Sequence, residues 1–385
     1  MKRLLPLFIA KFLLNVVFWY SIEKLFMTTI GFDMAMIGVM AAVYSVMSVT
    51  MEVPSGILAD RWSRKGVMIL AAVSIAISGA IGAISYSVPI FLLSAVFWGF
   101  FDAFASGTAE SMIYDSLLEE QGHAKNYRKI QGWFQVVGGV ALFVSSLLGG
   151  FIGYHLGLRE VFALSIIPAV CAIIALLVFK ETSIQKESQD SHLFVHIKQT
   201  FAAVFRNPNL VWILASLLAL AQVSSLIGEM YQMWYIAIGA PITLYGIAGG
   251  IILSTYGIGG LVTQFISRKR HIILAMLLML IATIALMMAR QVWALVAAQF
   301  IVGFTSFTLI LVLTAQLQDF LPSRYRAGAG SAVNTSGRII YIGSALLFGW
   351  ITQQTNVFLA ATILVTFTAV ALYSELRAHL KSRAA

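Results

Sequence analysis

Residues 56–66 read GILADRWSRKG, a short charged stretch between two long apolar ones. Four of these eleven residues are charged, whereas residues 67–101 contain no Asp, Glu, Lys or Arg. The hydrocarbon core of a bilayer is crossed by about 20 predominantly apolar helical residues. The stretch is therefore predicted to be a loop between two membrane-spanning helices.

The composition of the whole chain indicates the same class. Of its 385 residues, 60% are hydrophobic and 11% are charged, and the mean hydropathy is +0.90, whereas soluble domains contain about 25% charged residues. A water-soluble protein is excluded, and the expected fold class is an all-α integral membrane protein. Apolar stretches recur along the chain and predict twelve transmembrane helices in two pseudo-symmetric bundles of six: residues 4–30, 34–58, 66–86, 89–117, 130–153, 160–179, 209–237, 242–266, 271–289, 292–318, 328–350 and 357–377.

The longest polar stretch lies between the sixth and seventh predicted helices. Within it Leu193, Ile197, Phe201 and Phe205 recur every four residues, which predicts an amphipathic helix that lies on a surface. We therefore expect an N-terminal six-helix bundle (residues 1–179), a cytoplasmic linker with an amphipathic helix (180–208) and a C-terminal six-helix bundle (209–385).

Basic residues fall almost entirely on one side of the predicted helices. Twenty Lys and Arg residues lie on that side, against Arg159 and Arg290 on the other. Such an excess marks the cytoplasmic side, so both termini and the linker are expected in the cytoplasm, with the chain in a cell membrane. The net charge of +9 follows from this topology. Because the basic residues are dispersed through loops, nucleic-acid binding is not expected.

The polar loop resembles the signature between the second and third helices of the major facilitator superfamily, although Ser63 stands where a glycine is usual. The segments EVPSG (52–56) and SGTAESMIYDSL (106–117) resemble a bacterial branch of that superfamily in which substrates are often unassigned, and the chain as a whole resembles its drug/proton antiporters. The resemblance covers essentially the full length and implies two six-helix bundles that give alternating access to a central cavity. The loop residues in the expected positions are Gly56, Asp60, Arg61, Arg64 and Lys65.

The resemblance also implies a cytoplasmic gate. Asp60 would face the positive N-terminal end of helix 11 near Gly328, and Arg64 would reach Asp115 at the foot of helix 4. The simpler alternative is that these arginines only follow the positive-inside bias. The expected gate comprises Gly56, Asp60, Arg61, Arg64, Lys65 and Asp115.

Ionisable residues inside the predicted helices indicate a functional site. A charge that faces lipid at the bilayer centre costs about 2.5–3.5 kcal/mol, so these side chains are expected to face protein or water, where carboxylates can exchange protons. Lys11, nearer the cytoplasmic end, could instead extend out of the membrane. Arg338 could be a counter-charge, a site for an anionic group or part of a structural ion pair. The proton-coupling candidates are Glu23, Asp102, Glu110 and Glu229.

Helical spacing gathers polar residues into stripes on predicted helices 1, 4, 7 and 10. In the superfamily these four helices line the central cavity, so the stripes and the resemblance agree. The alternative for any single stripe is hydrogen bonding between packed helices. The candidates for the substrate cavity are Asn15, Trp19, Ser106, Gln222, Ser225, Tyr231, Gln232, Gln299, Ser306 and Arg338.

These features predict a proton-coupled secondary active transporter, most consistent with an antiporter that exports lipophilic organic compounds or antibiotics. The antiporter signature of the family is incomplete, because residues 138–150 retain glycines but lack the expected proline, so the direction of transport stays open. The alternatives are proton-coupled uptake of a nutrient or siderophore-like solute, a lipid flippase, and a non-transporting membrane receptor. An enzyme is not expected, because no nucleophile, base and orienting group converge. The expected partners are a small-molecule substrate, protons and the lipid bilayer, for a monomer without cofactor or metal.

Overall fold

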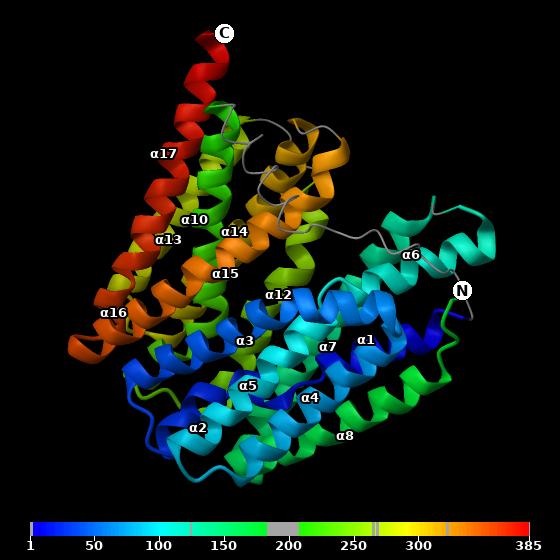
Figure 1. Ribbon diagram of the computed structural model, residues 1–385. Coiled ribbons are helices and arrows are strands. Elements are labelled where there is room, and N and C mark those ends of the chain that lie inside the picture. The colour runs from blue at the N-terminus through cyan, green and yellow to red at the C-terminus, as the bar shows by residue number, and fades with distance from the viewer. Residues whose placement is uncertain are drawn as a thin grey trace. The chain divides into compact units, whose positions relative to one another are not determined.

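The computed structural model describes residues 3–123, 125–182, 208–263, 266, 269–320 and 323–384 (Figure 1). Every regular element in these ranges is a helix, which confirms the predicted all-α class. The chain divides into two compact units: unit 1 comprises residues 1–33, 40–189 and 241–257, and unit 2 comprises residues 34–39, 190–240 and 258–385. The amphipathic helix predicted within 180–208 lies outside the described residues, which include only 180–182 and 208 of that range.

Ten helices in the described ranges are long and apolar enough to cross a bilayer, and the bent pair α1–α2 would be an eleventh. The predicted helix at 328–350 is present as α15 but is less apolar, because Asn334 and Arg338 lie within it. The helices of unit 1 are α1 (Leu5–Asn15), η1 (Phe18–Ser21), α2 (Glu23–Thr29), α3 (Met34–Arg61, except residues 34–39), α4 (Arg64–Ile84), α5 (Val88–Ala105), α6 (Thr108–Gln121), α7 (Tyr127–His155), α8 (Leu158–Val178) and the first part of α12 (Ile242–Val262). Unit 2 contains α10 (Pro208–Met230), α11 (Gln232–Ala237), α13 (Lys269–Met288), α14 (Val292–Phe320), α15 (Ser323–Gln354), α16 (Val357–Ala360) and α17 (Thr362–Ala384).

The first predicted helix, residues 4–30, is broken rather than continuous. α1 ends at Asn15, a 3₁₀ turn follows, and α2 begins at Glu23 with a bend of 45°. No proline lies between these two helices. The bend therefore needs another cause.

Hydrogen bonds to α7 and α8 hold the chain at this break. The Phe18 N–H donates to Ser165 Oγ at 3.1 Å, and Ser21 Oγ donates to the Ser146 carbonyl at 3.0 Å. The Phe18 carbonyl lies so close to Gly149 that a Cβ at that position would overlap with it. A broken helix is tolerated inside a membrane where neighbouring helices satisfy its freed backbone groups. Here Ser165 accepts from the freed Phe18 N–H, and Gly149 leaves room for the Phe18 carbonyl.

A second predicted helix, residues 89–117, is divided at Ser106 and Gly107. Gly107 has φ of +69°, a left-handed conformation that favours glycine, and α6 begins at the next residue. Both residues are exposed, and a Cβ on Gly107 would meet no atom within 4 Å. The backbone conformation, rather than crowding, therefore requires glycine at this position.

A third interruption, at Tyr231, separates α10 from α11 within the predicted helix 209–237. Gln299 of α14 donates from Nε2 to the Tyr231 carbonyl at 3.1 Å and accepts from the Tyr235 hydroxyl. All three side chains are buried within unit 2. One residue of α14 thus satisfies the backbone of its neighbour where the helix is interrupted.

Each unit has its own packed interior. In unit 1, α4 packs against α5 and α8, and Trp19 stacks on Phe162 with ring centroids 5.3 Å apart. α7 and the first part of α12 approach closely at glycines, since a Cβ on Gly150 would lie 2.7 Å from the Gly246 Cα. In unit 2, α10 packs against α14 and α17. Small residues permit such close approach between membrane helices.

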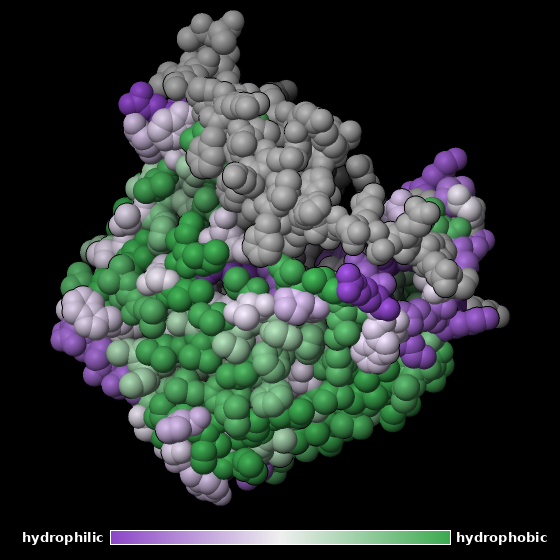
Figure 2. Space-filling view, in the orientation of Figure 1, coloured by the Kyte–Doolittle hydropathy of each residue, from purple (hydrophilic) through white to green (hydrophobic). Residues whose placement is uncertain are grey.

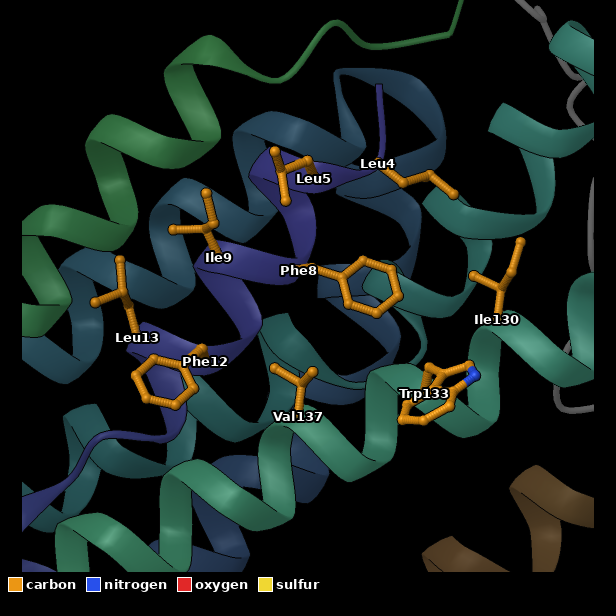
Figure 3. Close-up of a pocket in the computed structure, with 9 residues that line it drawn as sticks. All are labelled: Leu4, Leu5, Phe8, Ile9, Phe12, Leu13, Ile130, Trp133 and Val137. Atoms are coloured by element: carbon orange, nitrogen blue, oxygen red, sulfur yellow. The ribbon is translucent and has the colours of Figure 1, made fainter. Parts of the chain in front are cut away.

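The surface of unit 1 is largely apolar. On the face drawn in Figure 2, hydrophobic residues extend over its helices, and hydrophilic ones gather where α6 ends and α7 begins. An apolar groove of about 620 Å³ lies between α1 and α7, lined among others by Phe8, Phe12, Trp133 and Val137 (Figure 3). Exposed apolar surface of this extent is unusual for a soluble monomer and fits a bundle surrounded by lipid.

Candidate functional site

The basic end of unit 1, defined here by Arg3, Arg64 and Lys65, contains a nearly buried ion pair. Arg64, the first residue of α4, donates to Asp115 of α6, and the two side chains are only 12% and 4% exposed. Asp60 lies 3.4 Å from Arg64 but is 63% exposed. Exposed ion pairs contribute little to stability, so the interaction with Asp115 dominates.

Glu181 completes this end of the unit. Its carboxylate accepts from Ser63 Oγ at 2.6 Å and from the Lys65 N–H at 3.1 Å, so a negative charge lies at the N-terminus of α4. Lys65 Nζ donates in turn to the Leu177 and Phe179 carbonyls at 2.7 and 2.9 Å, at the C-terminus of α8. The sequence analysis did not identify Glu181, because a single acidic residue after a helix carries no signal of its partner.

The N-terminal segment is tied to the same end. Arg3 lies 2.7 Å from Glu119 of α6 and donates to the Lys180 and Glu181 carbonyls at 3.1 and 3.0 Å. The remaining predicted gate residues, Gly56 and Arg61, are exposed. The predicted contact between Asp60 and helix 11 stays a prediction.

Two carboxylates flank the break between α5 and α6. Asp102, four residues before Ser106, accepts a hydrogen bond from Ser48 Oγ of α3 at 2.6 Å. Glu110 lies in the first turn of α6 and accepts from Gln131 Nε2 of α7 at 3.3 Å. Both carboxylates are partly buried, so the structure brings the two predicted proton carriers of helix 4 to either side of one exposed break.

Lys11 and Tyr127 lie within electrostatic reach of Glu110. Lys11 is partly buried, with Nζ 5.3 Å from the centroid of the Phe134 ring and Cε against Gly138. It is therefore held between α1 and α7 rather than extended out of the membrane. Burial, and to a lesser extent the charge of Glu110, raise the pKa of Tyr127, which precedes the apolar part of α7.

Other predicted residues of helix 1 are engaged inside unit 1. Glu23 Oε2 lies 2.5 Å from Nζ of Lys24, whose side chain is 1% exposed. Trp19 is 3% exposed and belongs to the aromatic interior. Asn15 donates from Nδ2 to the Lys11 carbonyl at 2.8 Å. The charge of Glu23 is thus compensated by its neighbour in the chain.

Two predicted residues of unit 2, Gln222 and Gln299, join helices to one another. Gln222 of α10 donates to the Gly337 carbonyl and accepts from Ser344 Oγ, both at 2.9 Å. Ser306 is buried and bonds to the Gly303 carbonyl at 3.2 Å. Gln232 is also buried, as Tyr231 and Gln299 are, whereas Ser225, Glu229 and Arg338 are partly buried.

The sequence analysis missed two further carboxylates inside apolar helices. Glu52 is partly buried in α3, and Glu375 of α17 is 3% exposed and within electrostatic reach of Lys269. The signal that singled out Glu110, an acidic residue inside an apolar span, applies equally to both. Within the described ranges, no group of three or more His, Cys, Asp or Glu is placed to hold a metal ion.

Comparisons with known proteins agree with this architecture. The family described as Major Facilitator Superfamily matches residues 4–266. The inner membrane transport protein YajR of Escherichia coli is 25% identical over 182 residues, which are 47% of this chain and only 38% of that protein. The crystal structure of the nucleoside transporter NupG aligns over 99% of each chain with a TM-score of 0.77 and 18% identity. That of a D-xylose-proton symporter aligns over 97% of each chain with a TM-score of 0.75 and 17% identity. At these identities the structural likeness concerns the fold.

Proposed function

The chain belongs to the Major Facilitator Superfamily, and we propose that it is a proton-coupled secondary active transporter that exports lipophilic organic compounds by alternating access. Loops rich in Lys and Arg lie on the cytoplasmic side of a membrane. In this proposal both termini, which lie on the same side as the basic loops, are therefore cytoplasmic. The basic end of unit 1 is accordingly the cytoplasmic end, and the ion pair of Arg64 with Asp115 is part of the gate there.

The observation that carries the proposal is the exposed break at Ser106 and Gly107. These residues lie inside the apolar span Val88–Glu120, yet both are exposed and depart from helical geometry. Irregular backbone within a membrane is tolerated only where it is buried in protein or lines a water-filled cavity. An exposed break therefore supports a water-filled cavity at this point, as a path for a solute requires.

Asp102 and Glu110, on either side of the break, are the carboxylates best placed to carry protons. Proton exchange needs a carboxylate that water can reach in one conformation and that protein encloses in another. Glu23 suits this role less well, because the buried Lys24 already compensates its charge. Glu229, two residues before the interruption at Tyr231, is the corresponding candidate in unit 2.

Uptake is the second candidate function. The chain shares its fold with a D-xylose-proton symporter and a nucleoside transporter, and the incomplete helix 5 signature does not specify export. Export is preferred because the carboxylates around the break, Asp102 and Glu110, favour neutral or cationic solutes. Lipid flipping and ligand sensing without transport are the remaining alternatives.

Reconstitution tests the proposal. The purified chain is placed in liposomes that contain a pH-sensitive dye, a proton gradient is imposed, and lipophilic amines, neutral antibiotics, nucleosides and sugars are added in turn. Proton movement opposite to a lipophilic compound is expected. Movement in the same direction as a nucleoside or sugar would establish uptake, movement of a labelled lipid would establish a flippase, and binding without flux would contradict transport.

A further inference from the structure

One buried acceptor beside Glu110 has no donor. Gln131 Oε1 is buried and makes no hydrogen bond to any described residue, while Nε2 of the same amide donates to Glu110 at 3.3 Å. The reverse orientation of the amide would place its oxygen against the carboxylate, so the assignment follows from the hydrogen bond. A buried acceptor without a donor is costly, which makes this oxygen a place where a ligand donor would be favourable.

A cationic side chain of the protein already lies beside these acceptors. Lys11 reaches from α1 towards α7, with its ammonium 5.3 Å from the Phe134 ring centroid and within electrostatic reach of Glu110. Its Cε lies in the space that a Cβ on Gly138 would fill, since that Cβ would lie 2.7 Å away. The glycine thus leaves room for the lysine stem between the two helices.

These groups together have the chemistry of an ammonium site. A carboxylate supplies opposite charge, an amide oxygen accepts an N–H, and an aromatic ring attracts a cation through its face. We propose that Glu110, Gln131 and Phe134 bind the ammonium group of a lipophilic substrate, and that Lys11 competes with this substrate for Glu110. The inference rests on the proposed function, to which it adds a substrate class: lipophilic amines that carry at least one N–H.

The competition gives Lys11 a defined role. Lys11 lies within electrostatic reach of Glu110, so without substrate its ammonium partly compensates the charge of the carboxylate and lowers the cost of that charge in an apolar span. An arriving amine takes over Glu110 and supplies the donor that Gln131 Oε1 lacks. A quaternary ammonium has no N–H and cannot satisfy that oxygen, so it should bind more weakly than an amine of the same size.

Binding to the full-length purified protein tests this site. A labelled lipophilic tertiary amine, protonated at the working pH, is compared with its N-methylated quaternary analogue. The wild type should prefer the amine, and Gln131→Leu should remove that preference. Lys11→Met should tighten binding of the amine by about tenfold, a change equivalent to about 1.4 kcal/mol. Lys11→Arg keeps the positive charge that competes for Glu110 and should bind the amine as the wild type does. Lys129→Met, at an exposed lysine of α7, is the matched control and should leave binding unchanged.

If Lys11 only stabilised the packing of α1 against α7, its replacement would weaken binding of the amine instead of tightening it. If Lys11→Met weakened binding while its melting temperature matched the wild type, or if the quaternary analogue bound as well as the amine, the proposal would be overturned. Glu110→Gln in the Lys11→Met background should cancel the gain. If the wild type couples the flux of lipophilic compounds to protons and none of these substitutions alters that flux, the binding site is overturned but the transport function stands. Absence of coupled flux in the wild type would overturn the transporter, while the binding comparison would still decide the site.

Discussion

Asp115 pairs with Arg64 at the basic end of unit 1, and it lies on the same short helix as Glu110. α6 therefore carries a candidate proton site in its first turn and the ion pair of the proposed gate about one and a half turns further on. Arg3 binds Glu119 near the end of the same helix. α6 is separated from α5 at Gly107. Protonation of Glu110 and opening of the proposed gate at Asp115 would therefore both act on the same short helix.

Asp115→Asn should destabilise the protein by about 3 kcal/mol, because it leaves the charge of the nearly buried Arg64 without its main partner. Thermal unfolding in detergent measures this effect. Asp60→Asn is the matched control, since Asp60 is 63% exposed and its loss should cost less than about 1 kcal/mol. Equal effects of the two substitutions would contradict the assignment of Asp115 as the main partner.

Gly107→Ala should destabilise the protein by about 1–2 kcal/mol, because alanine must adopt the left-handed backbone at φ of +69°. Gly56→Ala provides the comparison, as Gly56 is exposed within α3 and a Cβ there would meet no atom within 4 Å. That control should be neutral or stabilising, since alanine favours helix by about 1 kcal/mol over glycine. If Gly107→Ala melted at or above the wild-type temperature, the left-handed backbone at this break would not require glycine.

Most of the fold, but only part of the site, was predictable from the sequence. Long apolar stretches predicted the helices because a bilayer demands apolar spans. The break between α1 and α2 was not predictable, because its hydrogen bonds go to the Ser165 hydroxyl and the Ser146 carbonyl, in distant parts of the chain. The break at Gly107 was hidden among 30 glycines, of which a minority adopt positive φ.

The sequence also could not decide whether a polar stripe lines a cavity or bonds to a neighbouring helix. Gln222 and Gln299 have the helical spacing of cavity residues, yet both are buried and bond between helices. Periodicity places a residue on a face, but whether that face meets water or another helix depends on packing. The sequence left open whether Lys11 extends out of the membrane, and the space beside Gly138 that holds it has no signature in the sequence.

Gly149→Ala should disrupt the broken first helix, because a Cβ there overlaps with the Phe18 carbonyl, which is backbone and cannot rotate away. We expect a loss of at least about 2 kcal/mol, in the range of overpacking substitutions. The same substitution at Gly132, also on α7, meets no atom within 4 Å and should not lower the melting temperature. If the two variants behaved alike, the close approach of η1 and α7 would be refuted.

Substrate-driven proton flux through proteoliposomes of Glu110→Gln tests the central claim most directly. The amide cannot exchange a proton, so gradient-driven transport of a lipophilic compound should fall to the level of empty liposomes, and a cooperative melting transition should show that the variant is folded. Glu160→Gln, at an exposed carboxylate of α8, should transport normally. Full proton-coupled transport by Glu110→Gln would contradict the account and remove this carboxylate as the proton carrier.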